Sequence, residues 1–444
     1  MPRSREPRLD PAGEEDLRRL QQASFSYFLR ETDAATGLVR DSTHTGSPAS
    51  IAAIGLALTA YVVACGRGFM THEEARTRTL ATLRFLGNSP QGPQPDAAGH
   101  KGFFYHFLSM DSGRRVWNCE LSTVDTAYLI AGALCAGVYF AAKHPEEAEI
   151  RRIADALYRR VDWAWATGRG VTLTHGWTPE NGFLAHRWRR GYSEAILLYL
   201  LALGSPTHPI PPRAYAASTA FYEWRNLYGL EFLYAGPLFI HQLSHVWVDF
   251  RGIRDAYMRE RGIDYFENSR RATLAQQQYA IRNPRGFVGY GDHCWGITAS
   301  EGPGPATKTI GGKRRRFFDY VARGIPDGPD DGTLAPWAVV ASLPFAPEIV
   351  LPTIRRIEEM GIGRNGPYGF EATFNPTFPA DVPGQRGWIS PRNFGLNNGP
   401  IVVMIENFRS GLVWEALKKS PYLVRGLRRA GFRGGWLGTG RGAS

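Results

Sequence analysis

The sequence has 444 residues, of which 43% are hydrophobic and 12% aromatic, with 12 Trp and 19 Tyr, a composition typical of a globular protein with a large core. No apolar run reaches transmembrane length, and four scattered cysteines do not make a disulfide framework or a CxxC metal site. The net charge of +11 invites a nucleic-acid interpretation, but the excess is partly local, in residues 313–316 and 425–441, and solvated faces explain such runs first.

The first half of the chain is predicted to be mainly helical. Apolar residues at helical spacing and capping signals predict helices over residues 14–30, 50–64, 71–86, 126–143, 145–166 and 193–203. The short aromatic run from Lys101 to Phe107 predicts a strand or a pocket wall. The charged segment of residues 1–16 has no apolar signal-peptide core, so we expect a cytoplasmic protein, or a periplasmic one if a targeting segment has been removed.

The second half continues the pattern of helices and long loops. We predict a helix over 214–227, a long helical region ending near 281, and weaker helices over 334–343, 347–360, 400–410 and 411–417. Strand signals are few and short, and no linker divides the chain. These features predict one all-α domain over residues 1–444, a toroid of paired helices with long aromatic loops, a polar N-terminal extension of about residues 1–13 and a basic Gly-rich tail of about 425–444.

Three carboxylates in the stretch from 120 to 194 are the first catalytic candidates: Glu120, Asp125 and Glu194. Asp125 and Glu194 each stand at the head of an apolar helix, where burial raises a carboxyl pKa and the helix N-terminus lowers it. Such opposed environments suit acid and base roles. The alternative is structural: an N-cap for Asp125 and a first-turn carboxylate favoured by the helix dipole for Glu194.

Other catalytic patterns are missing from the sequence. There is no G-x-S-x-G, and Gly311-Gly312-Lys313 lacks the first glycine and the final Ser or Thr of a phosphate-binding loop. His241 and His245 are four residues apart, but Gln242 stands where a zinc protease has glutamate, and no third ligand can be named. We therefore expect no metal and no cofactor. Carboxylates remain, and two of them usually cut a glycosidic bond.

Aromatic and charged residues in the loops are candidates for sugar binding. Any one of the tryptophans Trp117, Trp177, Trp188, Trp247 and Trp295 could be a stacking platform, but each alone is more often part of the core. Asp249 ranks behind the other carboxylates, and an ion pair with Arg251 is its structural alternative. The predicted substrate-binding set is Trp177, Trp188, Tyr192, His106, Arg251, Asp249 and Trp295.

Motifs spread from Ser50 to Trp414 resemble, in order, the bacterial glucoamylase-like domain family, which includes endo-β-1,2-glucanases and related β-1,2-glucooligosaccharide hydrolases. Among them are K-G-F-F-Y-H-F, E-L-S-T-V-D-T-A, H-G-W-T-P-E-N-G-F, G-Y-S-E-A-I-L-L-Y-L-L-A-L-G-S-P-T-H-P and D-G-T-L-A-P. The resemblance implies an (α/α)6 barrel and inverting glycoside hydrolysis. It implies Glu194 as general acid, with Asp125 and Glu120 in the sugar cleft. The base stays open between Glu371, in Y-G-F-E-A-T-F-N, and Asp125 acting through water.

The leading hypothesis is therefore hydrolysis of β-glucan chains or oligosaccharides, most simply β-1,2-linked glucose. One alternative is a glycosidase of another linkage, α-glucan or another β-glucan, and a second is a non-catalytic glycan-binding protein whose acid pair is idle. A nucleic-acid binder would require the basic runs to form one face. We expect a glucan or oligosaccharide as the partner, no nucleic acid and no membrane, and the sequence leaves the oligomeric state open.

Overall fold

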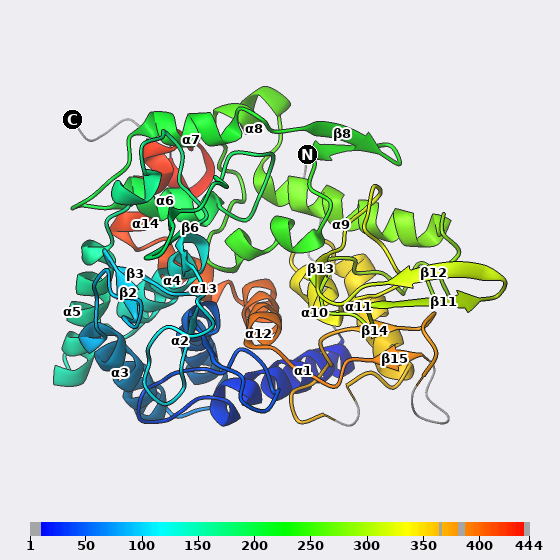
Figure 1. Cartoon of the computed structure of the whole chain (residues 1–444), viewed down its shortest axis with the longest axis horizontal. Coiled ribbons are helices and arrows are strands. Elements are labelled where there is room, and N and C mark those ends of the chain that lie inside the picture. The colour runs from blue at the N-terminus through cyan, green and yellow to red at the C-terminus, as the bar shows by residue number, and fades with distance from the viewer. Residues whose placement is uncertain (1–9, 364–365, 381–386, 439–444) are drawn as a thin grey trace.

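The computed structural model describes residues 10–363, 366–380 and 387–438. Most of the predicted N-terminal extension, residues 1–9, and the end of the predicted tail, residues 439–444, lie outside these ranges. The described chain is mostly helical (Figure 1), as predicted. The helices are α1 (Pro11–Arg30), α2 (Ile51–Arg67), α3 (His72–Asn88), α4 (Thr123–Tyr139), α5 (Pro145–Arg160), α6 (Ile196–Gly204), α7 (Pro212–Thr219), α8 (Ala256–Arg261), α9 (Tyr265–Arg282), α10 (Pro336–Ala341), α11 (Pro347–Glu359), α12 (Gly395–Arg409), α13 (Leu412–Leu417) and α14 (Pro421–Arg429).

Helices α2 and α4 form the centre of the core and are apolar on nearly all sides. Each begins at a serine, Ser50 or Ser122, whose hydroxyl accepts a hydrogen bond from the backbone N–H three residues ahead. Gly55 and Gly132 lie where the two helices cross, and a Cβ on Gly132 would overlap the carbonyl group of Gly55. The close crossing therefore depends on small residues at both positions.

The remaining helices pack around this centre, some in contact with α2 or α4 and others outside them. Helix α2 also contacts α12, α4 contacts α6, and α12 contacts α10. On the outside, α1 packs on α12, α3 on α2, α5 on α4, α14 on α6 and α11 on α10. Helix α9 packs against a 3-10 turn over Leu238–His241. The inner helices are the more apolar, since each is covered on two sides.

The strands are short, as the sequence predicted, and form small antiparallel sheets of two or three strands. They are β1 (Ala49–Ser50) with β4 (Phe107–Leu108), β2 (Gly99–His100) with β3 (Phe103–Phe104), β5 (Leu121–Ser122) with β6 (Gly176–Thr178) and β7 (Gly182–Phe183), β8 (Trp224–Leu227) with β9 (Leu230–Leu233), β10 (Ala299–Ser300) with β13 (Val321–Ala322), β11 (Ala306–Ile310) with β12 (Lys313–Phe317), and β14 (Phe374–Asn375) with β15 (Trp388–Ile389). The β11–β12 hairpin projects from the edge of the molecule (Figure 1).

Two helix predictions are wrong in detail. The helix predicted over 214–227 ends at Thr219, and its last residues form strand β8, because Tyr228 and Gly229 adopt positive φ and turn the chain back. The long helical region before 281 is two 3-10 turns followed by α8 and α9. Helix α14, which Ser420 caps, overlaps the start of the predicted basic tail and packs on α6, with Gly426 against the backbone of Leu200. In addition, α1 begins at Pro11, inside the predicted extension.

Within the described ranges, no helix combines the length and the apolar character needed to cross a membrane.

Candidate active site

The junction of β5 and α4 carries two of the predicted carboxylates. Glu120 precedes β5 and Asp125 lies in the first turn of α4, so one short strand fixes both side chains relative to the core helices. The Ser122 hydroxyl accepts a hydrogen bond from the Asp125 backbone N–H and donates one to its Oδ2 atom at 2.5 Å. Asp125 is buried, whereas Glu120 is partly exposed. The N-cap of this helix is thus Ser122, and the carboxylate of Asp125 is left for another role.

His106 links the two carboxylates. Its Nδ1 lies 2.9 Å from Glu120 Oε1 and its Nε2 lies 3.5 Å from Asp125 Oδ2. Burial alone would lower the pKa of His106, but Asp125, Glu120 and Asp41 together outweigh burial and raise it to about 9. His106 is therefore an imidazolium at neutral pH, with both nitrogens able to donate to carboxylates. The hydrogen bond from His106 also helps to lower the pKa of Glu120 against the effect of burial.

Asp41 is a third acidic member of the cluster, and the sequence analysis missed it. It lies in the loop after α1, where its N–H donates to Pro48 and its carbonyl accepts from Gly395 at the start of α12. Burial raises the pKa of Asp41 to about 6, with Asp125 acting in the same direction and His106 against it. The only local signal is one Asp in a Ser/Thr/Gly-rich loop, which is ordinary turn chemistry.

Glu194 lies directly before α6 and is partly exposed. Burial raises the pKa of its carboxyl to about 7, and the nearby charge of Asp125 acts in the same direction, while a backbone N–H opposes them. The carbonyl of Glu194 accepts a hydrogen bond from Ser244, which fixes the backbone before α6. A carboxyl that holds its proton near neutral pH beside a second acid is the arrangement that general acid catalysis requires.

Tyr320 approaches the same carboxylates from the segment between β12 and β13. Tyr320 as a whole is 69% exposed, and partial desolvation of its phenol raises its pKa, with the charges of Glu194, Asp125 and Asp41 acting in the same direction. A solvent-exposed phenol thus lies within electrostatic range of three carboxylates. The cluster therefore draws on both halves of the chain, α4 and α6 from the first and the segment between β12 and β13 from the second.

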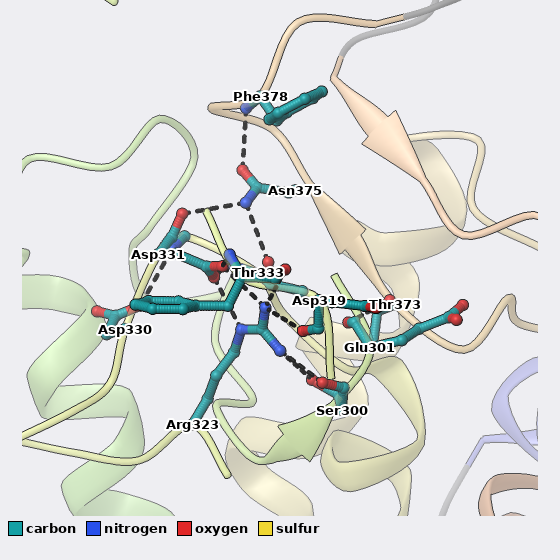
Figure 2. A network of polar contacts seen from close by, with 12 residues as sticks. Ser300, Glu301, Asp319, Arg323, Asp330, Asp331, Thr333, Thr373, Asn375 and Phe378 are labelled. Carbon is teal, nitrogen blue, oxygen red and sulfur yellow. Dashed lines mark hydrogen bonds and ion pairs between the residues drawn. The ribbon is translucent and has the colours of Figure 1, made fainter. Parts of the chain in front are cut away.

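A buried arginine holds this segment in place. Figure 2 shows the Arg323 guanidinium directed at Asp331, with Nε and Nη2 each 2.8 Å from a carboxylate oxygen. Its remaining N–H groups donate to the carbonyls of Ser300, Phe318 and Asp319, and both members of the ion pair are fully buried. Because the network spans both sides of Tyr320, it fixes the loop that presents the ring.

Two tryptophans that the sequence predicted to contact sugar, Trp188 and Trp177, are packed against other aromatic rings rather than exposed to solvent. Trp188 is 9% exposed, stacks on His175 with ring centroids 3.8 Å apart, and donates from Nε1 to Thr123 Oγ1 at 3.0 Å. Burial lowers the pKa of His175 to about 4, so this ring is neutral, and Glu120 opposes the shift. Trp177 is half-buried in an aromatic cluster with His100 and Trp165.

Tyr192 is nearly buried, with its ring stacked on Tyr265, and burial raises the pKa of its phenol, with Asp255 and Glu194 acting in the same direction. Tyr192 and Tyr128 are therefore buried aromatic residues within electrostatic range of Glu194.

The remaining predicted site residues are placed elsewhere. Trp295 is fully buried and donates to Thr353 on α11, so no part of it can contact a sugar. Asp249 is 3% exposed and forms ion pairs with Arg251 and with Lys418, which follows α13. It therefore has the structural role that the sequence analysis gave as the alternative to substrate binding. Glu371 accepts a hydrogen bond from the N–H of Gly363 after α11, and burial raises its pKa, with neither Glu194 nor Asp125 among the groups that shift it.

These residues form one cluster with distinct electrostatic roles. Glu194 holds a proton near neutral pH, while Asp125 lies between the imidazolium of His106 and the Ser122 hydroxyl. Such a pair can protonate a leaving group on one side of a bond and activate water on the other. Among the described residues, no group of three or more His, Cys, Asp and Glu side chains is arranged to hold a metal ion.

Comparisons with known proteins point to one family. A family model named Glycoamylase, described as "Putative glucoamylase", matches residues 185–421. An exo β-1,2-glucooligosaccharide sophorohydrolase (non-reducing end) of Parabacteroides distasonis is 29% identical over 451 residues, which cover 94% of this chain and 58% of that protein. The chain thus spans less than two thirds of that relative's length.

Solved structures agree with the family match. A protein of Bacteroides uniformis described in the same words as the family model has a TM-score of 0.84 and 31% identity, over 97% of this chain and 100% of that one. An endo-β-1,2-glucanase from Chitinophaga pinensis, solved with sophorotriose and glucose, has a TM-score of 0.81 and 26% identity, over 96% of this chain and 99% of that one.

Proposed function

The chain belongs to the Glycoamylase family, and from this premise we propose that it is a glycoside hydrolase that cleaves chains or oligosaccharides of β-1,2-linked glucose. The family resemblance expected from the sequence motifs is confirmed. The substrates in the names of the relatives from Parabacteroides distasonis and Chitinophaga pinensis support the β-1,2 linkage, although the family description would suggest an α-glucan.

The observation that carries the proposal is the cluster at the starts of α4 and α6, where Asp125 contacts His106 and Ser122 and burial, with the charge of Asp125, raises the pKa of Glu194 to about 7. Glu194 is the general acid: it donates its proton to the leaving glycosidic oxygen as the bond to the anomeric carbon breaks. Asp125 is the base: it takes a proton from a water molecule that attacks the anomeric carbon from the opposite face of the ring. His106 and Ser122 orient the Asp125 carboxylate for this proton transfer.

Asp41 is the other candidate base. Its pKa of about 6 leaves it ionised at neutral pH, and it shares the neighbours His106 and Asp125. Glu371, the other base that the sequence left open, is not among the groups that act on Asp41 or Glu194, which makes it the weaker candidate. After each turnover Glu194 is ionised and the base is protonated, and exchange with solvent restores both.

We also propose that the paired helices close into an (α/α)6 toroid that forms a single catalytic domain. The inner partners would be α12, α2, α4, α6, the 3-10 turn over Leu238–His241 and α10, each with an outer partner in α1, α3, α5, α14, α9 and α11. This arrangement gathers the starts of α4 and α6, and hence Asp125 and Glu194, at one end of the ring.

The test is a panel of linear and cyclic glucans assayed for released reducing sugar with four proteins: the wild type, Asp125→Asn, Asp41→Asn and Glu371→Gln. We expect activity on β-1,2-glucans, a loss on the order of a hundredfold or more in the variant that lacks the base, and near-normal turnover in Glu371→Gln. Cleavage of only α-linked glucans would overturn the linkage. Binding without cleavage of any glucan would overturn the enzymatic role.

A further inference from the structure

Trp117 is the most exposed tryptophan among the described residues, with 68% of its surface accessible. It lies in the loop between β4 and β5, three residues before Glu120. Single exposed aromatic residues are common on protein surfaces and need no explanation by themselves. Three further features of this position set it apart.

The first is the backbone. Trp117 and Asn118 have φ values of +57° and +50°, so two consecutive non-glycine residues adopt the left-handed region. That conformation is unfavourable for a bulky L-residue and persists only where the surrounding structure enforces it. Asn tolerates it, but Trp does not do so readily.

The second is the arginine that enforces it. Arg115 has a buried guanidinium, with only 2% of its side chain exposed. It donates from Nε to Cys119 O at 2.6 Å and from Nη2 to Asn118 O at 2.8 Å, and it pairs with both carboxylate oxygens of Glu180. Its guanidinium also lies 4.7 Å from the centroid of the Tyr105 ring. The buried guanidinium of Arg115 thus holds the strained turn, and this turn places the Trp117 indole in solvent.

The third is the link to the acid cluster. The Trp117 ring lies 5.3 Å from the ring of Phe107, and Phe107 stacks on His106 with centroids 4.1 Å apart and planes 9° from parallel. His106 in turn contacts Glu120 and Asp125. The Phe107 and His106 rings therefore link the exposed indole to the proposed catalytic carboxylate Asp125.

We propose that Trp117 is the platform of a distal sugar subsite, where the indole stacks on a glucosyl unit of the glucan that lies outside the units joined by the cleaved bond. The apolar C–H face of a glucose ring fits a flat aromatic surface, and a pre-ordered turn lowers the entropy lost when the sugar binds. This inference rests on the proposed function and adds a specificity for chain length to it.

The test compares Trp117→Ala and Trp117→Phe with Phe221→Ala, a matched control in which the removed ring is 62% exposed and lies over Arg189. Substrates are β-1,2-glucooligosaccharides of increasing length. We expect Trp117→Ala to raise KM for the longest chains about tenfold, with kcat and the KM of the shortest cleaved chain unchanged. Trp117→Phe should recover part of the loss, and Phe221→Ala should match the wild type.

A second measurement tests the Trp117 subsite independently of whether the substrate is β-1,2-linked. Binding of the glucan panel is titrated by calorimetry in a Glu194→Gln background with and without Trp117→Ala, and melting temperatures confirm that the fold is kept. Weaker binding of long glucans without Trp117, whichever linkage binds, supports the subsite. Equal binding with and without the indole, or an equal loss for long and short chains, would overturn it. A wild type inactive on β-1,2-glucans would instead refute the proposed function.

Discussion

Replacement of Glu194 by Gln should make the protein more stable above neutral pH. In the folded protein the pKa of Glu194 is about 7, whereas the ordinary value for Glu is 4.5. The folded state therefore binds this proton more tightly than the unfolded state. Below pH 4.5 both states are protonated and Glu194 has no effect on stability. As the pH rises from 4.5 to 7 the unfolded state ionises first, so the free energy of unfolding falls, and the full cost is present above pH 7.

The size of the effect follows from that difference in pKa. A difference of about 2.5 units corresponds to about 3 kcal/mol. Because Glu194 is partly exposed to solvent, we discount this to roughly 1–2 kcal/mol. Gln cannot ionise, so Glu194→Gln should escape this cost, and for a chain of this length the gain equals about 1–2 °C in melting temperature.

The assay is a series of thermal melts of the wild type and Glu194→Gln between pH 4 and pH 9. The control is Glu260→Gln, which changes an exposed carboxylate on α8. We expect the two melting temperatures to coincide near pH 4 and to diverge above pH 7, with the Gln variant higher and the control parallel to the wild type. A constant difference across the whole range would refute the reasoning, since it would mean that Glu194 ionises in the folded protein as it does in the unfolded chain.

Three further predictions follow from the same site. The value of kcat/KM should fall above a pH of about 7, where Glu194 loses its proton. A fall in kcat/KM below about pH 6 as well would identify Asp41 as the base. A profile that stays flat to pH 9 would contradict the assignment of Glu194 as the acid. Arg323→Met should cost about 3–5 kcal/mol of stability, because it leaves the carboxylate of Asp331 buried without its partner. An unchanged midpoint in a denaturant titration would contradict this prediction. Trp188→Ala should lower the free energy of unfolding by about 3–5 kcal/mol because the ring is buried, whereas Trp177→Ala should lower it less because that ring is half-buried. Thermal melts measure the effect on stability, and glucan titrations of the same variants measure the effect on binding.

The sequence predicted best what is encoded locally. Helix periodicity, with the capping box that begins at Thr71 for α3, placed α2, α3 and α4 to within a few residues, and the starts of α4 and α6 pointed to Asp125 and Glu194. Both carboxylates do lie in one electrostatic cluster. His106 was expected to bind substrate, but its contacts with two carboxylates give it a further role that the short aromatic run around it did not indicate.

The sequence failed where a role depends on contacts between distant segments. Asp41 joins the cluster because its loop is held by the start of α12, more than 350 residues later in the chain, and no local pattern reports that contact. Tyr320 is within electrostatic range of the carboxylates, and its segment is held by the buried Arg323, shown in Figure 2, which pairs with Asp331 eight residues further along the chain. Trp295 was misassigned for the converse reason: the letters around a tryptophan do not reveal whether its ring faces a cleft or the core.

The most direct test of the account is a proton NMR time course of linear β-1,2-glucan hydrolysis by the wild type and by Glu194→Gln at equal concentrations. If Glu194 protonates the leaving oxygen while a base activates water on the opposite face, the newly formed reducing end appears first as the α-anomer, and the Gln variant is slower on the order of a hundredfold or more while it still binds the glucan. First appearance of the β-anomer would contradict the proposed inversion, and near-normal turnover by Glu194→Gln would contradict the central claim.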